Sequence, residues 1–407
     1  MRRIYEPLLK EHFSHYEQMM FLVGPRQVGK TTLAQLLQTL FQETAYFNWD
    51  VIKDRQKILA GQTFIEDYFP LQRLREQKPL IVFDELHKYR EWKNYLKGFY
   101  DLYKDDYSIL VTGSARLDIF QSGGDSLMGR YFQCRVHPIS IRECIDAKRN
   151  TYRDLSTEIV QPNRIDDDNF NSLYQYGGFP KPFLERNQRF FHRWQSLRQR
   201  QLLTEDIKSL THLQEISQLE ILAELLKHQV GQMINRSNLS NKVQVSVQTV
   251  ARWIATLERF YYCFLITPWS KNISRSLIKE PKIYLWDWSV LEDEGKRFEN
   301  FIASHLLKSV HHWNDLGLGN YTLHYLRNKD KKEVDFLITK NQKPWILVEA
   351  KSSNNQKVSP ALEYFQSETQ APYAFQVVLN MDYVDKDCFQ FHVPYIVPAR
   401  TFLSQLI

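Results

Sequence analysis

The apolar runs in the first third of the chain are short, and each one stops at polar or glycine residues. They are MMFLV at residues 19–23, LIVF at 80–83 and ILV at 109–111. Continuous apolar runs of this length are typical of strands buried on both faces of a parallel sheet. Helical spacing relates four leucines after the first run, Leu33, Leu36, Leu37 and Leu40. Residues 1–140 are therefore predicted to form an α/β domain with a parallel sheet.

A different pattern covers residues 211–290. A helix is predicted at 217–230, then a short polar helix, then a longer helix for which Ser246 is the expected N-cap. The core face of the longer helix is predicted from its spacing as Val250, Trp253, Ile254 and Leu257. Two strand runs, FYYCFLITP and IYLWD, follow. Helix, helix-turn-helix and hairpin is the order of a winged helix.

Residues 291–407 return to an α/β pattern. An amphipathic helix is predicted at 295–309, and a hairpin joins strands at 321–327 and 332–338 through polar turn residues. A third strand is predicted at 345–351.

A glycine-rich segment follows the first apolar run. Every fixed position of G-x-x-x-x-G-K-[ST] is matched by Gly24, Pro25, Arg26, Gln27, Val28, Gly29, Lys30 and Thr31, with Thr32 next. Glycines let backbone N–H groups turn towards phosphate oxygens, and the helix N-terminus adds positive charge. Lys30 is expected to neutralise the β- and γ-phosphates, and Thr31 to offer its hydroxyl to Mg²⁺. The segment predicts ATP as a ligand.

The second and third apolar runs end in residues suited to the same site. Asp84 is predicted to hold the Mg²⁺ shell, and Glu85 to polarise the attacking water as a general base. After the third run, Thr112 or Ser114 is expected to point towards the γ-phosphate if that strand lies between the other two. An ordinary Gly-Ser turn is the alternative for Ser114.

Acidic residues recur in the last third. Asp335 and Glu349 are expected on adjacent strands, with Lys351 on the same face as Glu349 and Glu299 on the preceding helix. Carboxylate oxygens suit Mg²⁺ or Mn²⁺, and a neighbouring lysine can orient water. The order Glu, Asp, Glu-x-Lys resembles the PD-(D/E)xK nuclease core. The alternative is a salt-bridged cluster on an inactive core.

Motifs across nearly the whole chain resemble prokaryotic AAA-superfamily ATPases with a C-terminal domain of unknown function. The resemblance rests on GPRQVGKTTL, IVFDELHKY, LVTGSAR, LMGRYFQCRVHPISIREC, YGGFPKP and KIYLWD. It implies that Ser114 serves as sensor 1, that residues 141–210 form a helical lid, and that Arg130 is an arginine finger in a homo-oligomer. A surface arginine paired with a local acid is the alternative for Arg130.

Nucleic-acid contacts are expected from the winged helix. Gln248, Thr249 and Arg252 on its third helix are candidates for the major groove, and Lys271 and Arg275 for phosphates. The net charge of +6 permits an anionic partner. The alternative is a winged helix used for protein contacts or as a spacer.

Composition places the chain among globular proteins, with 43% hydrophobic and 25% charged residues in 407 positions. The four cysteines are too far apart for a zinc site, and no signal core or membrane-length apolar run is present, so a cytoplasmic location is expected. His305, His311 and His312 are expected on the surface. Together these features predict a Mg²⁺-dependent ATPase that acts on nucleic acid. The alternative is an ATP-driven signalling or assembly switch.

Overall fold

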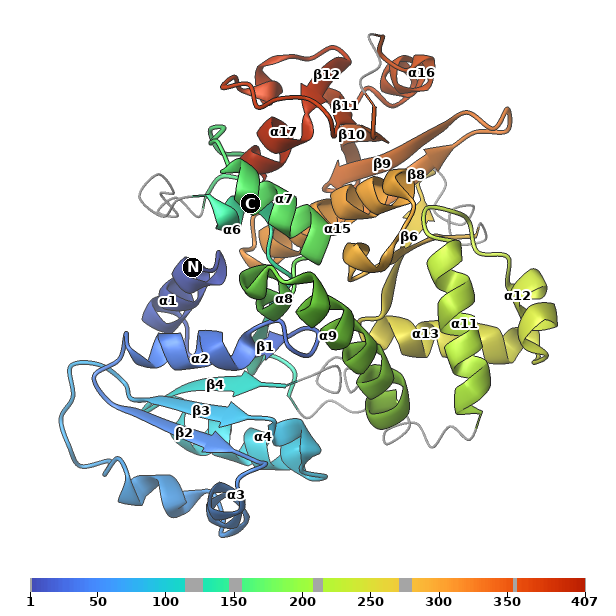
Figure 1. Ribbon diagram of the computed structural model, residues 1–407. Helices are drawn as coiled ribbons and strands as arrows, with labels where there is room; N and C mark the ends of the chain where they lie inside the picture. Colours follow the sequence, from blue (N-terminus) through green and yellow to red (C-terminus); the bar gives the residue numbers. More distant parts are fainter. Residues whose placement is uncertain are drawn as a thin grey trace. The chain divides into compact units, whose positions relative to one another are not determined.

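The computed structural model describes residues 2–113, 127–145, 156–207, 215–270, 280–353 and 357–406. They divide into two compact units, an N-terminal unit of Arg2–His137 and a C-terminal unit of Pro138–Ile407. Figure 1 shows the elements of both. The finer division at residues 140, 210 and 290 stays a prediction.

The N-terminal unit alternates strands and helices along the chain. Its helices are α1 (Tyr5–His15), α2 (Lys30–Gln38), α3 (Ile52–Leu59) and α4 (Trp92–Tyr103), with short 3-10 turns η1 (Thr63–Asp67) and η2 (Leu86–Lys88). Its strands are β1 (Met19–Val23), β2 (Thr44–Asn48), β3 (Leu80–Asp84), β4 (Ser108–Thr112) and β5 (Tyr131–Arg135).

A parallel sheet organises this unit. In the described residues the strand order is β2-β3-β4-β1-β5, and every neighbouring pair is parallel. Strand β4 lies between β3 and β1, which is the arrangement that the sequence required for Thr112 to reach the site. The predicted α/β class with a parallel sheet is confirmed.

Apolar side chains fix the layers around the sheet. Phe21, Phe83 and Val111 from alternate strand positions pack with Leu96 and Phe99 of α4. Helices α1 and α2 lie on the other side of the sheet in Figure 1. Because parallel strands all end at one edge, this packing brings the polar residues that follow β1, β3 and β4 together.

The C-terminal unit begins with helices. These are α6 (Ile141–Cys144), α7 (Asp167–Tyr176), α8 (Pro180–Glu185), α9 (Gln188–Arg200), α11 (Ile216–His228), α12 (Arg236–Val243) and α13 (Val247–Arg259). The Ser246 hydroxyl accepts the backbone N–H of Thr249 at 3.0 Å, so Ser246 is the N-cap of α13 as predicted. The predicted core face of α13, at Val250, Trp253, Ile254 and Leu257, is buried.

The rest of the C-terminal unit is built on a mixed sheet. Its strands are β6 (Cys263–Pro268), β7 (Lys282–Leu285), β8 (Tyr321–Arg327), β9 (Glu333–Lys340), β10 (Lys343–Lys351), β11 (Tyr373–Val378) and β12 (Tyr395–Pro398). Its later helices are α15 (Glu294–Asp315), α16 (Pro360–Thr369) and α17 (Ala399–Gln405), with 3-10 turns η5 (Trp288–Val290) and η6 (Cys388–Gln390).

One sheet joins strands that the sequence assigned to two domains. Among the described residues its order is β12-β11-β10-β9-β8-β6-β7. Strand β6 pairs with β7 antiparallel and with β8 in parallel, through Thr267–His324 and Pro268–Tyr325. The hairpin expected to form the wing is therefore continuous with the sheet that carries Asp335 and Glu349. This continuity brings residues of β7 close to the carboxylates of β9 and α15.

Candidate functional site

At two positions of the loop between β1 and α2, the backbone has a conformation that only glycine adopts easily. Gly24 has φ +146° and Gly29 has φ +100°, both in the left-handed region. A side chain at Gly24 would also collide with the backbone carbonyl of Val136. Lys30 then begins α2, so that the loop leads directly into a helix N-terminus. The predicted strand, glycine loop and helix are all present.

Lys30 is held beside its own loop. Its side-chain Nζ donates to the carbonyl oxygens of Gly24 at 2.9 Å and Pro25 at 2.8 Å, and only 7% of the residue is exposed. These carbonyls are neutral acceptors, so a phosphate group would be a more favourable partner for the ammonium. The geometry suits a lysine that exchanges backbone contacts for an anionic ligand.

Asp84 is the centre of a polar cluster at the end of β3. The Thr31 hydroxyl donates to Asp84 Oδ2 at 3.2 Å, and the hydroxyls of Thr112 and Tyr46 also donate to this carboxylate. Burial and the hydrogen bond to Asp84 raise the pKa of Tyr46. Thr31 and Asp84 offer hard oxygen ligands side by side, which fits the Mg²⁺ that ATP would bring.

Tyr46 was missed from the sequence. It lies on β2, and the parallel register of Tyr46 with Val82 and of Asn48 with Asp84 carries its side chain to the carboxylate. Only the pairing of β2 with β3 could have revealed it.

Glu85 follows β3 in a left-handed conformation, with φ +55°. Its N–H donates to the Thr112 carbonyl at 3.1 Å. Its Oε2 lies 3.3 Å from Lys88 Nζ and 3.6 Å from His87 Nε2. The carboxylate is therefore beside Asp84 along the chain but is held by cationic or titratable side chains of the next turn.

Two further residues of this unit, Ser114 and Arg130, were predicted to belong to the ATP site. Ser114 lies outside the described residues. Arg130 forms a two-pronged contact with Asp101, through Nε to Oδ1 at 2.7 Å and Nη2 to Oδ2 at 3.1 Å. This matches the alternative of a surface pair within one chain, and the finger role stays a prediction.

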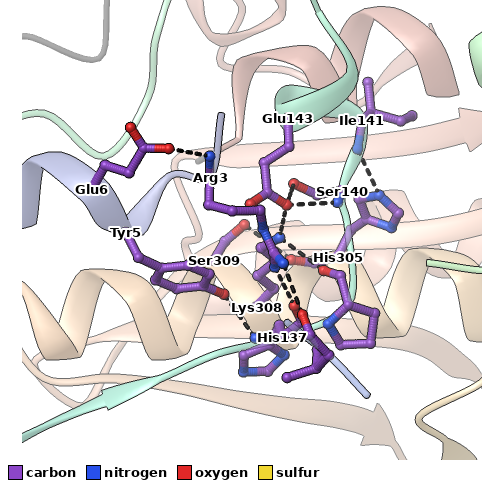
Figure 2. Close-up of polar contacts among 12 residues, drawn as sticks. Arg3, Tyr5, Glu6, His137, Ser140, Ile141, Glu143, His305, Lys308 and Ser309 are labelled. Atoms are coloured by element: carbon purple, nitrogen blue, oxygen red, sulfur yellow. Dashed lines mark hydrogen bonds and ion pairs between the residues drawn. The ribbon is translucent and has the colours of Figure 1, made fainter. Parts of the chain in front are cut away.

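Arg3 ties the loop to the end of the N-terminal unit. Its guanidinium donates to the Val28 carbonyl at 2.9 Å and to the His137 carbonyl at 2.6 Å. The His137 N–H in turn donates to the Tyr5 hydroxyl at 2.8 Å, as Figure 2 shows. Arg3 was not singled out by the sequence, because it lies far from the loop along the chain.

The C-terminal unit brings Asp335, Glu349 and Lys351 together as predicted. Beyond the pair Phe336–Val348, β9 and β10 place Asp335 next to Glu349, and Asp335 Oδ2 accepts the N–H of Ala350 at 2.9 Å. Lys351 Nζ lies 2.7 Å from Glu349 Oε1. The Glu349 side chain is 7% exposed, and its Oε2 has no hydrogen-bond partner among the described residues.

Lys282 of β7 enters the same cluster. Its Nζ lies 2.5 Å from Glu333 Oε1, 3.7 Å from Glu299 Oε1 and 3.8 Å from Asp335 Oδ1, and its side chain is 3% exposed. Burial acts to lower the pKa of Lys282, but the surrounding carboxylates outweigh it and raise the pKa. Neither Lys282 nor Glu333 was predicted from the sequence.

Charge in this cluster is nearly balanced by the chain itself. The acids are Glu299, Glu333, Asp335 and Glu349, and the cations are Lys282, Arg327 and Lys351. Burial and the Glu299 carboxylate raise the pKa of Asp335 to about 7, against the opposite effect of Lys282. In the part of the chain that the structure describes, no three His, Cys, Asp or Glu side chains are arranged to hold a metal ion.

The predicted nucleic-acid residues lie on α13 where they are described. Gln248 and Arg252 are exposed, one helical turn apart. Thr249 is half-buried, and its hydroxyl contacts the Ser246 hydroxyl at 2.9 Å. Lys271 and Arg275 lie outside the described residues.

The prediction of surface histidines is wrong for His305 and His312, which are 3% and 2% exposed. The Ile141 N–H donates to His305 Nε2 at 3.1 Å, and His305 Nδ1 faces the Phe301 carbonyl at 2.8 Å. Figure 2 shows Lys308 beside Glu143 in the same region. Burial lowers the pKa of both histidines to about 3. The helix α15 is longer than predicted and buried around much of its circumference, so its histidines are in the core.

Comparison with known proteins supports the ATPase prediction for the N-terminal unit. Residues 16–145 match the family model "AAA domain". Residues 167–293 and 294–396 match two models described as "Domain of unknown function", DUF8612 and DUF4143. The chain therefore carries an AAA-type ATPase domain followed by domains of unknown function, and this supports nucleotide hydrolysis.

Similar proteins occur in Mycobacterium tuberculosis and Haemophilus influenzae. An uncharacterized protein of Mycobacterium tuberculosis is 22% identical over 346 residues, which are 81% of this chain and 70% of that protein. One from Haemophilus influenzae is 20% identical over 360 residues, 81% of each. AMPPCP-bound DnaA from Aquifex aeolicus aligns with 63% of this chain and 87% of its own at 11% identity, but a TM-score of 0.33 is too low to establish a shared fold.

No helix in the described residues is both long and apolar enough to cross a membrane.

Proposed function

We propose that this protein hydrolyses ATP with Mg²⁺ at the loop and β3 site, and couples the cycle to binding or processing nucleic acid, with DNA favoured. The observation that carries the proposal is the contact of Thr31 with Asp84 beside the glycine loop of Lys30. A hydroxyl, a carboxylate and a lysine at one edge of a parallel sheet suit a metal–nucleotide complex.

Each residue has a separate task in this proposal. Lys30 would leave the carbonyls of Gly24 and Pro25 and neutralise phosphate charge. Thr31 and Asp84 would hold Mg²⁺, whose contribution is to neutralise charge on the phosphates. Glu85 would turn from Lys88 to accept the proton of the attacking water.

Nucleic-acid coupling is supported by the exposed Gln248 and Arg252 on α13, the helix predicted to be the third of a winged helix. Lys271 and Arg275 are the predicted phosphate contacts. The rival function is an ATP-driven signalling or assembly switch, in which this surface binds protein.

The test combines a Glu85→Gln variant, expected to bind ATP and hydrolyse it slowly, with DNA-binding measurements at increasing salt. Coupling predicts that ATP changes DNA affinity and that affinity falls steeply with salt. Gln248→Ala with Arg252→Ala should weaken binding, while exposed Arg236→Ala on α12 is the matched control. ATP turnover with no salt-sensitive DNA binding would favour the switch.

A homo-oligomer is part of the proposal, with Arg130 acting on a neighbouring subunit. Arg130 would have to leave Asp101, so Arg130→Ala should impair hydrolysis more than ATP binding, and Asp101→Asn should not. Mixing Arg130→Ala with Lys30→Ala subunits should restore some turnover. No recovery in mixed assemblies would contradict a role between subunits.

Metal-dependent cleavage of nucleic acid is a second candidate function, for the C-terminal unit. The buried, unpartnered Glu349 Oε2 next to Asp335 and Lys351 supports it. Mg²⁺ or Mn²⁺ would supply charge stabilisation at phosphorus when bound. Cleavage of DNA or RNA by the full chain with ATP, lost in Asp335→Ala and Lys351→Ala, would support this function. Absence of cleavage on linear, branched and single-stranded substrates would leave a nuclease-shaped binding domain.

A further inference from the structure

Lys282 occupies the centre of the acidic cluster in the C-terminal unit. Within 4 Å of its ammonium lie carboxylate oxygens of three residues from two elements: Glu299 of α15, and Glu333 and Asp335 of β9. Two of these acids, Glu299 and Asp335, belong to the constellation that the sequence assigned to a metal. The oxygens expected to bind a metal therefore already contact a cation of the protein, the Lys282 ammonium.

The position of Lys282 is fixed by its backbone. It is the first residue of β7, it pairs with Ile266 of β6, and it forms an isolated bridge with Met233. Its ammonium also lies 5.5 Å from the ring centre of Tyr325. The side chain is buried between these elements, so the ammonium has little freedom to move away into solvent while the sheet is intact.

Tyr284, two residues further along β7, holds Glu299 in the same arrangement. Its hydroxyl donates to Glu299 Oε1 at 2.7 Å, the same oxygen that lies 3.7 Å from Lys282. Gly231 closes this side of the cluster, because a Cβ there would come within 2.9 Å of Glu299 Oε2. Glu299 is therefore oriented by residues of the β7 hairpin as well as by its own helix.

A divalent metal does not fit this arrangement as it stands. Mg²⁺ and Mn²⁺ need several oxygens at close range, and an ammonium within 4 Å of those oxygens would repel a second cation. Glu349 contributes one oxygen to Lys351, and Asp335 Oδ2 accepts the Ala350 N–H. Among the four acids of this cluster, Glu349 alone has a buried oxygen, Oε2, without a hydrogen-bond partner in the described residues.

We infer that Lys282 is the resident cation of this cluster and that it excludes divalent metal from the carboxylates of Glu299 and Asp335. The inference concerns the regulation of the second candidate function and rests on that site. It does not depend on ATP hydrolysis. The site would accept metal only after the Lys282 ammonium is removed or displaced.

The test measures Mn²⁺ binding to the full chain without nucleotide, by calorimetry and by the electron paramagnetic resonance signal of free Mn²⁺. The unchanged protein should show no site sensitive to Asp335→Asn with a Kd tighter than about 1 mM. Lys282→Met keeps the aliphatic stem and removes the charge, so it should bind one Mn²⁺ at least about tenfold more tightly. Lys282→Arg keeps the charge and should behave as the unchanged protein.

Thermal unfolding gives a second readout. Mn²⁺ should raise the Tm of Lys282→Met and not that of Lys282→Arg or of Lys282→Met with Asp335→Asn, because only a ligand of the folded state stabilises it. If Lys282→Met fails to fold, the unchanged protein still decides the question. A tight Mn²⁺ site in it that Asp335→Asn abolishes would overturn the inference.

Equal Mn²⁺ affinity in Lys282→Met and the unchanged protein would also overturn it. Metal binding gained in Lys282→Met without any cleavage of nucleic acid would have a different meaning. The inference would stand, and metal-dependent cleavage as a function would fail.

Discussion

Two buried lysines define the two polar sites of this protein, and they differ in what holds them. Lys30 of the N-terminal unit faces the carbonyl oxygens of Gly24 and Pro25. Lys282 of the C-terminal unit faces the carboxylates of Glu299, Glu333 and Asp335. Carbonyl oxygens are neutral acceptors, so an anionic phosphate would be a stronger partner for the first ammonium. Carboxylates neutralise the second, so that it is an internal ion-pair partner.

The difference shows that residue type and burial do not by themselves identify a ligand-binding lysine. The charge of the groups around the ammonium decides whether the lysine can bind an anionic ligand. An ammonium among carbonyls attracts phosphate, while the same group among acids excludes a metal from them. The comparison predicts opposite consequences when each lysine is removed.

The largest effect is expected for Lys30→Ala. ATP hydrolysis should fall at least about 100-fold, because the variant lacks the ammonium that the loop presents at the start of α2 to neutralise the phosphates. The Tm should change little, since the hydrogen bonds to the Gly24 and Pro25 carbonyls are local to the loop. Steady-state turnover and thermal unfolding measure the two effects. Lys53→Ala, at an exposed position of α3, is the control, and near-normal turnover in Lys30→Ala would contradict the assignment of the site.

Lys282→Met should have the opposite effects, a large loss of stability and little change in ATP turnover. Removing one partner of a buried ionic cluster leaves uncompensated carboxylates, which costs about 3–5 kcal/mol of unfolding free energy. ATP turnover should be retained at temperatures where the variant is folded. Urea unfolding of this variant beside Lys282→Arg measures the effect. A loss of stability as large for the arginine variant would mean that shape, not charge, determines the role of Lys282.

Much of this structure follows from local sequence. The cap at Ser246, the core face of α13, the glycine loop and the pairing of Asp335 with Glu349 are fixed by neighbours a few residues away or by one hairpin. Tyr46 and Lys282 reach their sites through pairing between strands that are distant in sequence. No local pattern encodes that pairing, so these two residues could not be predicted.

A smaller effect is expected at Arg3, which supports the loop of Lys30. Arg3→Ala removes the link between the Val28 and His137 carbonyls, and the less ordered loop should bind ATP about tenfold more weakly. Arg3→Lys should give a partial loss, because an ammonium lacks the planar fork that reaches both carbonyls. Arg2→Ala, at an exposed residue, is the control. An unchanged Kd for ATP in Arg3→Ala would show that the loop is ordered without this contact.

The smallest effect is a pH dependence from the buried His305. Its pKa is lowered to about 3 in the folded chain, against 6.5 as its ordinary value. Between these values only the unfolded state takes up the proton, so the contribution of His305 to stability is complete above pH 6.5 and is lost progressively as the pH falls towards 3. From pH 7 to pH 5 this loss is about 2 kcal/mol.

His305→Gln, which keeps a donor and an acceptor, should lose correspondingly less stability over that interval in urea unfolding. His228→Gln, at a side chain that is 73% exposed, should retain the full dependence. His312 has a pKa lowered in the same way and should account for part of the loss that remains in His305→Gln. Identical pH profiles for His305→Gln and the unchanged protein would mean that His305 does not resist protonation in the folded state. The physical reason for the prediction is that a protonated Nε2 could no longer accept the Ile141 N–H.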